Sequence, residues 1–325
     1  MEWLNKNELR RVLQKQIPQL SDDDILSYRV EEDSSKGNNY SSRVFRIVVH
    51  MKEEGTSQPK YLALFSKVVI DSLGIIILED LCDKGYKLIN RIERLDYPKA
   101  VLVLRKLAKL HAASVALHKE EPELVEEAGK EIALDETFKE LKTIKSMLRV
   151  LETAREIPSK MLHVLNHGDL WLTNILFKVD EENNSLTDCK FVDFQLSSYA
   201  SPVIDLHNLL AANVQFHVFE DSQEALLQEY LQALNSFLIK FNTNLTLSYE
   251  DLKAEYDRTQ IFSFYSGIVI LIPVLADPEQ ATDFSNSSDA EMTETSLFNG
   301  IIDSKYYRKE LPKYLKYYKD KGILN

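Results

Sequence analysis

Two short stretches of the chain combine strand-like apolar runs with polar residues at their ends. In the first, residues 167–177, a His-Gly-Asp turn presents the carboxylate of Asp169, and Asn174 follows five residues later, directly before an apolar run. In the second, the β-type run 190–192 ends at Asp193. We interpret the two stretches as strands of a hairpin with polar residues at its mouth. Phosphoryl transfer needs such a set, because one carboxylate takes the proton of the acceptor hydroxyl or orients it, while an amide oxygen and a second carboxylate hold Mg²⁺.

The complete pattern, His-Gly-Asp-x-x-x-x-Asn followed by Val-Asp-Phe-Gln, resembles the catalytic loop and metal-binding aspartate of choline-kinase-like and aminoglycoside-phosphotransferase-like kinases. Two longer segments are still more similar to the ecdysteroid-kinase-like family of arthropods: NHGDLW..NILF and CKFVDFQLSSYASPVIDL. That resemblance implies that Asp169 is the catalytic base and that Asn174 and Asp193 hold Mg²⁺. It also implies that Asp205, in the SPVIDL stretch, braces the catalytic loop without binding metal.

The composition is that of a soluble globular protein, with 44% hydrophobic and 28% charged residues among 325. The formal net charge of −12 argues against a nucleic-acid-binding protein, which usually carries a basic patch. Cys82 and Cys189 stand apart, so they form neither a disulfide framework nor a metal-binding spacing. The first residues lack the basic and apolar regions of a signal peptide, and we therefore expect a cytoplasmic protein.

Strand patterns dominate the first part of the chain, at residues 44–49 and 61–65. The resemblance places a nucleotide-covering loop before them, at residues 36–42, although this segment has only one glycine. Its backbone amides and the hydroxyls of Ser41 and Ser42 are expected to contact phosphate oxygens of ATP. The alternative interpretation is an ordinary hairpin loop.

The apolar run 75–78 is followed by Glu79, Asp80 and Leu81, and the resemblance identifies it as the strand and hinge that receive adenine. Backbone groups from Glu79 to Leu81 would pair with the adenine edge, so the side chains there carry little information. The alternative for the two acidic residues is a solvated strand end.

The resemblance fails between these strands, where a kinase of this kind places a helix with a glutamate partner for the phosphate-binding lysine. Only residues 66–74 are available, whereas a helix, a further strand and their connections need roughly 25 residues. Lys67 is the candidate for that lysine, because LFSK resembles the LFVK strand of the family. The run 67–70 also fits a plain hairpin with 75–78, and the two interpretations stay open.

Helical patterns fill most of the rest of the chain. His111 falls on the apolar face of one helix, and we interpret it as a satisfied core residue. The apolar run 261–275 contains Pro273 and is too short to span a bilayer comfortably, so we expect a buried helix and no membrane segment. The expected helices are 3–16, 99–117, 123–161, 222–241, 249–275 and 306–324. Four aromatic residues either line an apolar acceptor pocket or pack in the core: Tyr256, Phe262, Phe264 and Tyr265.

These observations predict an α+β, protein-kinase-like two-lobe fold, with a truncated β-rich N-lobe at residues 1–81 and a mostly helical C-lobe at residues 82–325. The predicted function is ATP- and Mg²⁺-dependent phosphorylation of a hydroxyl on a small molecule, which the resemblance implies to be an ecdysteroid or another lipophilic alcohol. Two alternatives remain: a catalytically weak pseudokinase that binds a ligand, and a kinase for choline-like or antibiotic-like substrates. The sequence leaves the oligomeric state open.

Overall fold

The computed structural model describes residues 5–14, 17–32, 43–52, 60–69, 74–129, 160–180, 182, 185–277 and 304–324. The chain divides into two compact units, and the described residues of the two units separate between Gly85 and Tyr86. The loop expected at residues 36–42 lies outside the described residues. The same is true of most of the helical segment expected at residues 123–161.

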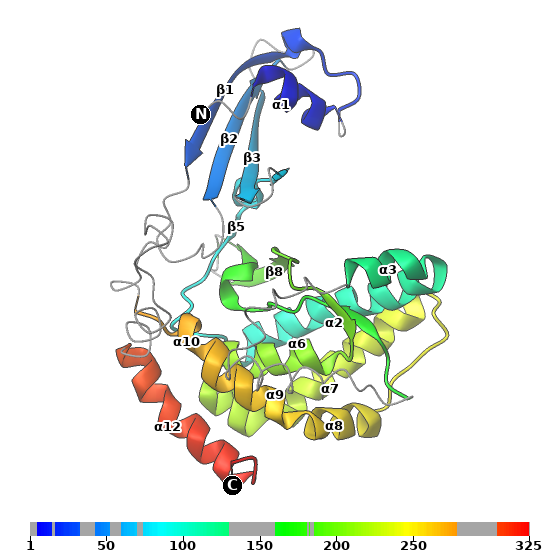
Figure 1. The fold of residues 1–325 in the computed structure, drawn as a ribbon, viewed down its shortest axis with the longest axis vertical. Helices are drawn as coiled ribbons and strands as arrows, with labels where there is room; N and C mark the ends of the chain where they lie inside the picture. The colour runs from blue at the N-terminus through cyan, green and yellow to red at the C-terminus, as the bar shows by residue number, and fades with distance from the viewer. Residues whose placement is uncertain are drawn as a thin grey trace, which may run out of the picture. The chain divides into compact units, whose positions relative to one another are not determined.

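The first unit is an antiparallel four-stranded sheet with a short helix (Figure 1). The helix and strands follow one another along the chain, and each strand pairs with its sequence neighbour: α1 (Lys6–Leu13), β1 (Ile25–Glu32), β2 (Arg43–Met51), β3 (Lys60–Val69) and β4 (Gly74–Glu79). Leu9 and Leu13 lie one turn apart on α1, and Ile47 and Val49 alternate on β2. Because both spacings put apolar side chains on one face, these residues form a common buried core.

Strand β3 is continuous from Lys60 to Val69, and its second half pairs with β4, so that Lys67 lies opposite Ile76. Only residues 70–73 lie between the two strands, which is too short for a helix and its connections. Features of both interpretations of Lys67, the family-like strand and the plain hairpin, are therefore found in one strand. Lys67 lies on the strand that contains LALFSK, and the same strand forms a hairpin with the strand before the expected hinge.

The second unit contains two small antiparallel sheets. The first has the order β5-β7-β8, with β5 (Tyr86–Lys87), β7 (Ile175–Val179) and β8 (Leu186–Phe191), and the second pairs β6 (Val164–Asn166) with β9 (Ser198–Ala200). Ile175 pairs with Phe191 and Phe177 pairs with Cys189, so the predicted hairpin forms. The alternating residues Ile175, Phe177 and Cys189 are fully buried, which fixes the register of the hairpin.

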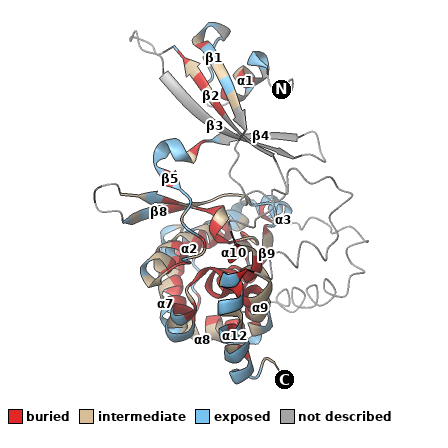
Figure 2. Ribbon diagram, turned by 90° about the vertical axis from the view of Figure 1, so that its left-hand side faces the viewer, coloured by how far each residue is buried: buried red, intermediate tan, exposed pale blue. Residues whose placement is uncertain are grey.

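Helices make up most of the second unit, and Figure 2 shows buried residues gathered where they meet. The two longest, α2 and α7, pack along one another, and α2 also contacts β6 and β8. The helices are α2 (Tyr97–Glu120), α3 (Pro122–Ala128), α6 (Val203–Asn208), α7 (Phe216–Lys240), α8 (Tyr249–Arg258), α9 (Gln260–Tyr265), α10 (Leu271–Val274) and α12 (Lys305–Asp320). Two π-helical segments interrupt them: η4 (Leu209–Asn213) and η5 (Ser266–Ile270).

The single helix expected at 249–275 is wrong, because the chain turns after Arg258 and continues as α9, η5 and α10. Thr259 is fully buried, and its hydroxyl donates to the carbonyl of Glu255. This bond occupies a backbone acceptor at the C-terminal end of α8. The expected burial of this run is confirmed only in part: Phe262, Leu271 and Val274 are buried, whereas Ile261 is exposed. Among the residues that the structure describes, no helix has both the length and the apolar character to cross a membrane.

Helix α12 packs on the second unit through tyrosines, as its aromatic spacing predicts. Tyr307, Tyr314 and Tyr318 are buried. The Tyr314 hydroxyl donates to the carbonyl of Ala211 at 2.7 Å, and the Tyr318 hydroxyl donates to the carbonyl of Ser263 at 2.7 Å. The C-terminal helix is therefore bonded to the backbone of both η4 and α9.

Candidate catalytic site

The His-Gly-Asp turn adopts a conformation that requires its glycine. Gly168 has φ +80°, in the left-handed region, and a β-carbon there would lie 1.9 Å from the carbonyl oxygen of Leu196. The backbone amides of His167 and Gly168 both point at the carboxylate of Asp205 on α6, at 2.7 and 3.0 Å. Asp169, the next residue, is half-buried.

Asp205 braces this turn, as the family resemblance implies. It is fully buried, and besides the two amides it faces Nε2 of His111 at 3.2 Å. Burial alone would raise the pKa of Asp205, but the hydrogen bond and attraction of His111, together with the Gly168 amide, bring it below its ordinary value. His111 uses its other ring nitrogen for the Tyr230 hydroxyl, at 2.7 Å. His111 is therefore the satisfied core residue that we expected, on the apolar face of α2.

The ring of His167 connects the two polar stretches. Its Nδ1 accepts from the Asp169 amide at 3.3 Å, and its Nε2 lies 2.9 Å from the carbonyl of Val192. Since a carbonyl only accepts, the proton is on Nε2 and the ring is in the Nε2–H tautomer. Both ring nitrogens are thus used in holding the backbone, and the ring packs against Phe194, with centroids 4.5 Å apart.

Asn174 contacts Asp169 directly. Its Nδ2 donates to both the backbone carbonyl and Oδ2 of Asp169, at 2.9 and 3.0 Å. These two acceptors fix which end of the carboxamide is nitrogen, and Oδ1 remains the end that can bind a cation. The amide of Val192 donates to the Asn174 carbonyl at 3.0 Å, so this backbone pairing extends the hairpin and brings Asp193, the following residue, to its mouth.

Asp193 has φ +67°, a conformation that is rare for residues other than glycine and is tolerated by aspartate. Strained backbone of this kind is frequent where a side chain is aimed at a ligand. The amide oxygen of Asn174 and the carboxylate of Asp193 are hard oxygen donors of the type that Mg²⁺ prefers. Their number also fits, because Mg²⁺ is usually bound by one or two protein oxygens together with substrate phosphates and water. The residues present therefore fit a magnesium ion.

The residues expected to contact the nucleotide belong to the first unit, whereas Asp169, Asn174 and Asp193 belong to the second. Glu79 is exposed and pairs with Lys84 at 2.5 Å, as a solvated strand end does. Leu81 begins the 3₁₀ turn η2 (Leu81–Lys84), and this turn is capped by the buried carboxylate of Asp80, which accepts from the Cys82 amide. For Lys67 the structure gives only the backbone position on β3. Ser41 and Ser42 lie outside the described residues.

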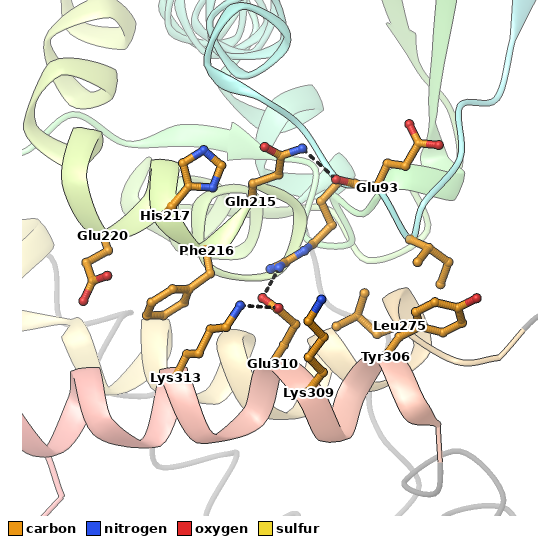
Figure 3. A pocket seen from close by; sticks show the side chains of 12 residues that line it. Glu93, Gln215, Phe216, His217, Glu220, Leu275, Tyr306, Lys309, Glu310 and Lys313 are labelled. Atoms are coloured by element: carbon orange, nitrogen blue, oxygen red, sulfur yellow. Dashed lines mark hydrogen bonds and ion pairs between the residues drawn. The ribbon is translucent and has the colours of Figure 1, made fainter.

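A pocket of ≈ 710 Å³ opens elsewhere in the second unit, between α12, the start of α7 and the segment before α2 (Figure 3). Arg94 is one of its lining residues and donates to Glu310, to the Tyr314 hydroxyl and to the carbonyl of Val214. Lys313 pairs with the same glutamate at 2.5 Å. None of the predicted site residues lines this pocket.

The aromatic residues considered for an acceptor pocket do not line it either. Tyr256 and Phe262 are buried, with 0% and 3% of their surface exposed, and Tyr256 packs against the ring of His207. Phe262 packs with Tyr265 against Ala200 and Ile204. Core packing, the second of the two interpretations offered for these residues, is what the structure shows for Tyr256 and Phe262.

Sequence reasoning missed the groups that hold the residues just after Asp169 in the candidate catalytic loop. The carboxamide of Asn213 bonds to the backbone of Leu170 and Leu172, and that of Asn208 reaches the carbonyl of Gly168. Both residues lie within the apolar sequence of α6 and η4, far from the loop along the chain. The signal of their role is the presence of two asparagines in a mostly apolar helical stretch, where asparagine is disfavoured.

A β-rich first unit, followed by a helical unit that carries the catalytic turn on a hairpin, is the α+β kinase-like architecture predicted from the sequence. The model of the ecdysteroid kinase-like family matches residues 71–157 and 133–243, which together make up more than half of the chain. The chain belongs to this family. The matched residues include Asp169, Asn174 and Asp193, whereas Lys67 and the residues before it lie outside the match.

Among solved structures, the chain is similar to an ethanolamine kinase of Plasmodium vivax. The two share 14% identity, with a TM-score of 0.44 over 95% of this chain and 88% of the other. A search of curated proteins finds no match.

Proposed function

We propose that the protein is an ATP- and Mg²⁺-dependent phosphotransferase that acts on a hydroxyl of a small molecule. The observation that carries this proposal is the contact between Asn174 and Asp169. One carboxamide orients the carboxylate that meets the acceptor and, with its oxygen end, offers a ligand to the metal. Membership of the ecdysteroid kinase-like family supports the reaction class and favours an ecdysteroid or another lipophilic alcohol as the acceptor.

In this proposal Asp169 accepts the proton of the hydroxyl or orients it for in-line attack on the γ-phosphate. Asn174 and Asp193 would hold Mg²⁺, which supplies charge neutralisation of the phosphates when bound. Asp205 and His167 keep the turn in place. On the nucleotide side, we assign Ser41, Ser42 and Lys67 to phosphate and the backbone of residues 79–81 to adenine. We further propose that the protein works in the cytoplasm, without nucleic-acid or membrane partners.

A specific observation favours a second candidate, a catalytically weak pseudokinase that binds a ligand. Residues 70–73 are too few to hold a helix between β3 and β4, so a glutamate partner for Lys67 cannot come from that place. A lysine without this partner organises the phosphates poorly. Binding of ATP without turnover is the behaviour that would single out this candidate.

The replacement Asp169→Asn tests the assignment. The amide keeps the size of the side chain but takes up no proton, so turnover should fall by about 10²- to 10⁴-fold, while ATP affinity and the unfolding midpoint stay near those of the parent chain. The measurement is ADP release with a panel of ecdysteroids, other sterol alcohols, choline, ethanolamine and an aminoglycoside. Turnover close to that of the parent chain would contradict the role of Asp169. ATP binding with no turnover of any acceptor by the parent chain would favour the pseudokinase.

A further inference from the structure

Asn213 is a fully buried polar residue that the catalytic chemistry does not use. It is the last residue of the π-helical segment η4, between α6 and α7. Its Nδ2 donates to the carbonyl of Leu170 and to the carbonyl of Asn208, both at 3.0 Å, and its Oδ1 accepts from the amide of Leu172 at 3.0 Å. The carboxamide therefore uses both protons and its oxygen, and it pairs with the loop backbone on both sides of Trp171.

The π-helical geometry explains how this contact is made. A π-helical turn contains one residue more than an α-helical turn, and such turns are frequent at functional sites. Here the side chain of Asn213 returns to the carbonyl of Asn208, five residues earlier, and closes the wide turn from the side. The same turn brings the carboxamide of Asn213 to the loop. The same side chain thus bonds both to the π-helical turn and to the loop.

Asn208 makes a second, longer contact to the same loop. Its Nδ2 lies 3.4 Å from the carbonyl of Gly168, and its Oδ1 accepts from the hydroxyl of Ser266 at 2.6 Å. Ser266 is the first residue of the other π-helical segment, η5, which packs against η4. The hydrogen bond from the buried Ser266 therefore orients the Asn208 carboxamide toward the loop.

We propose that Asn213, supported by Asn208 and Ser266, is a positioning residue for the phosphotransfer reaction. Asp205 holds the amides that precede Asp169, and Asn213 holds the backbone that follows it, so one helical segment grips the turn on both sides. A misplacement of about 1 Å in a catalytic group can lower the rate by about 10²-fold. This inference rests on the proposed function of the Asp169 site.

The variants Asn213→Asp and Asn213→Ala test the inference. In Asn213→Asp the carboxylate can still accept from Leu172, but its second oxygen faces the carbonyl oxygens of Leu170 and Asn208. We expect kcat to fall by about 10- to 100-fold, with KM for ATP changed by less than about twofold. In Asn213→Ala, amide hydrogen exchange at Leu172 should be faster by about tenfold or more, because its acceptor is lost.

Asn235 supplies a matched control, because its carboxamide also pairs with backbone on both sides. It donates to the carbonyl of Leu247 and accepts from the Leu247 amide, both at 2.9 Å, without touching the loop. Asn235→Asp and Asn235→Ala should lower stability while leaving kcat and the exchange of Leu172 unchanged.

Two results would overturn the inference: equal kcat in the Asn213 and Asn235 variants, or unchanged exchange of Leu172 in Asn213→Ala. If the parent chain phosphorylates no acceptor, the proposed function fails. The exchange measurement still decides whether Asn213 holds the loop.

Discussion

At the scale of the residue, Gly168 is subject to two restrictions, one on its backbone conformation and one on the space available for a side chain. Its φ of +80° excludes most side chains on conformational grounds, and the carbonyl of Leu196 excludes a β-carbon on steric grounds. Gly322 has a similar φ of +72°, but a β-carbon there meets nothing within 4 Å. The two glycines therefore share the conformational restriction, and only Gly168 has the steric one.

We expect Gly168→Ala to lower the free energy of unfolding more than Gly322→Ala does. The left-handed conformation costs about 1–2 kcal/mol in each variant. In Gly168→Ala the backbone near Leu196 must also move, because a contact of 1.9 Å is impossible, and the Asp169 turn moves with it. Urea unfolding gives the two stabilities, and ADP release gives the activities. Equal destabilisation of the two variants would show that the Leu196 contact relaxes without loss.

Single residues of the site were predictable where chemistry demands a residue type at a fixed spacing. The contact between Asp169 and Asn174 belongs to this class, whereas the roles of Asp169, Asn174 and Asp193 in catalysis and metal binding stay predictions. His111 was predictable as a core residue from the helical pattern. Asn213 was not, because its partners lie some forty residues earlier and no local pattern reports a bond to distant backbone.

At the scale of the element, α6 and α8 meet at a histidine with unusual surroundings. His207 is fully buried, its Nε2 lies 2.9 Å from the hydroxyl of Thr259, and its Nδ1 has no hydrogen-bond partner. The Thr259 hydroxyl donates to the carbonyl of Glu255, so it accepts from His207, and the proton of the neutral ring is on Nε2. Burial lowers the pKa of His207 to about 3.

This histidine predicts a loss of stability in mild acid. Below pH 6.5 the unfolded chain takes up a proton at His207, and the folded chain does so only near pH 3, so the free energy of unfolding falls with pH. Between pH 6.5 and 5 the loss from this residue is about 2 kcal/mol. Urea unfolding at several pH values measures it. In His207→Gln, which keeps a side-chain donor for Thr259, this part of the slope should vanish.

The exposed His217 on α7 offers a control for the removal of a histidine. A slope that persists unchanged in His207→Gln would show that other groups cause the acid sensitivity.

Elements were predictable where one face of a regular helix or strand carries the apolar residues. The helix that contains His111 and the hairpin at Asp169 were found in this way. The break at Thr259 and the π-helical turns were not, since they depend on buried polar contacts that the periodicity of apolar residues does not report.

At the scale of the whole molecule, the shortest connection of the first unit has the largest consequence for the proposed reaction. Strands β3 and β4 pair with each other, and only residues 70–73 of the sequence lie between them, so no helix fits between Lys67 and β4. The family match begins at the same place, at residue 71. The lack of room for a helix here could be predicted from the sequence, because counting the residues between two strands requires no knowledge of tertiary contacts.

We expect the chain to bind Mg²⁺-ATP weakly, because residues 70–73 are too few to hold a helix whose glutamate would direct the Lys67 ammonium group toward the phosphates. A chain that carries a family-like helix with its glutamate in place of residues 70–73 should bind ATP about tenfold more tightly or better. It should also unfold at a higher temperature. Calorimetry measures both quantities.

A flexible Gly/Ser insertion of equal length is the control for this change, and it should bring neither gain. Low-micromolar ATP binding by the original chain, unaffected by Lys67→Ala, would contradict the prediction.

The hydrogen bonds from α6 and η4 to the Asp169 turn also set the order in which the candidate site can be completed during synthesis. Residues 167–172 leave the ribosome before Asp205 and Asn213, and the Tyr314 hydroxyl, which bonds to Ala211 within η4, is made later still. Until those residues arrive, the amides of His167, Gly168 and Leu172 and the carbonyl of Leu170 lack the side-chain partners that they have in the folded protein. A growing chain therefore carries Asp169 and Asn174 before the side chains that hold their turn have been made.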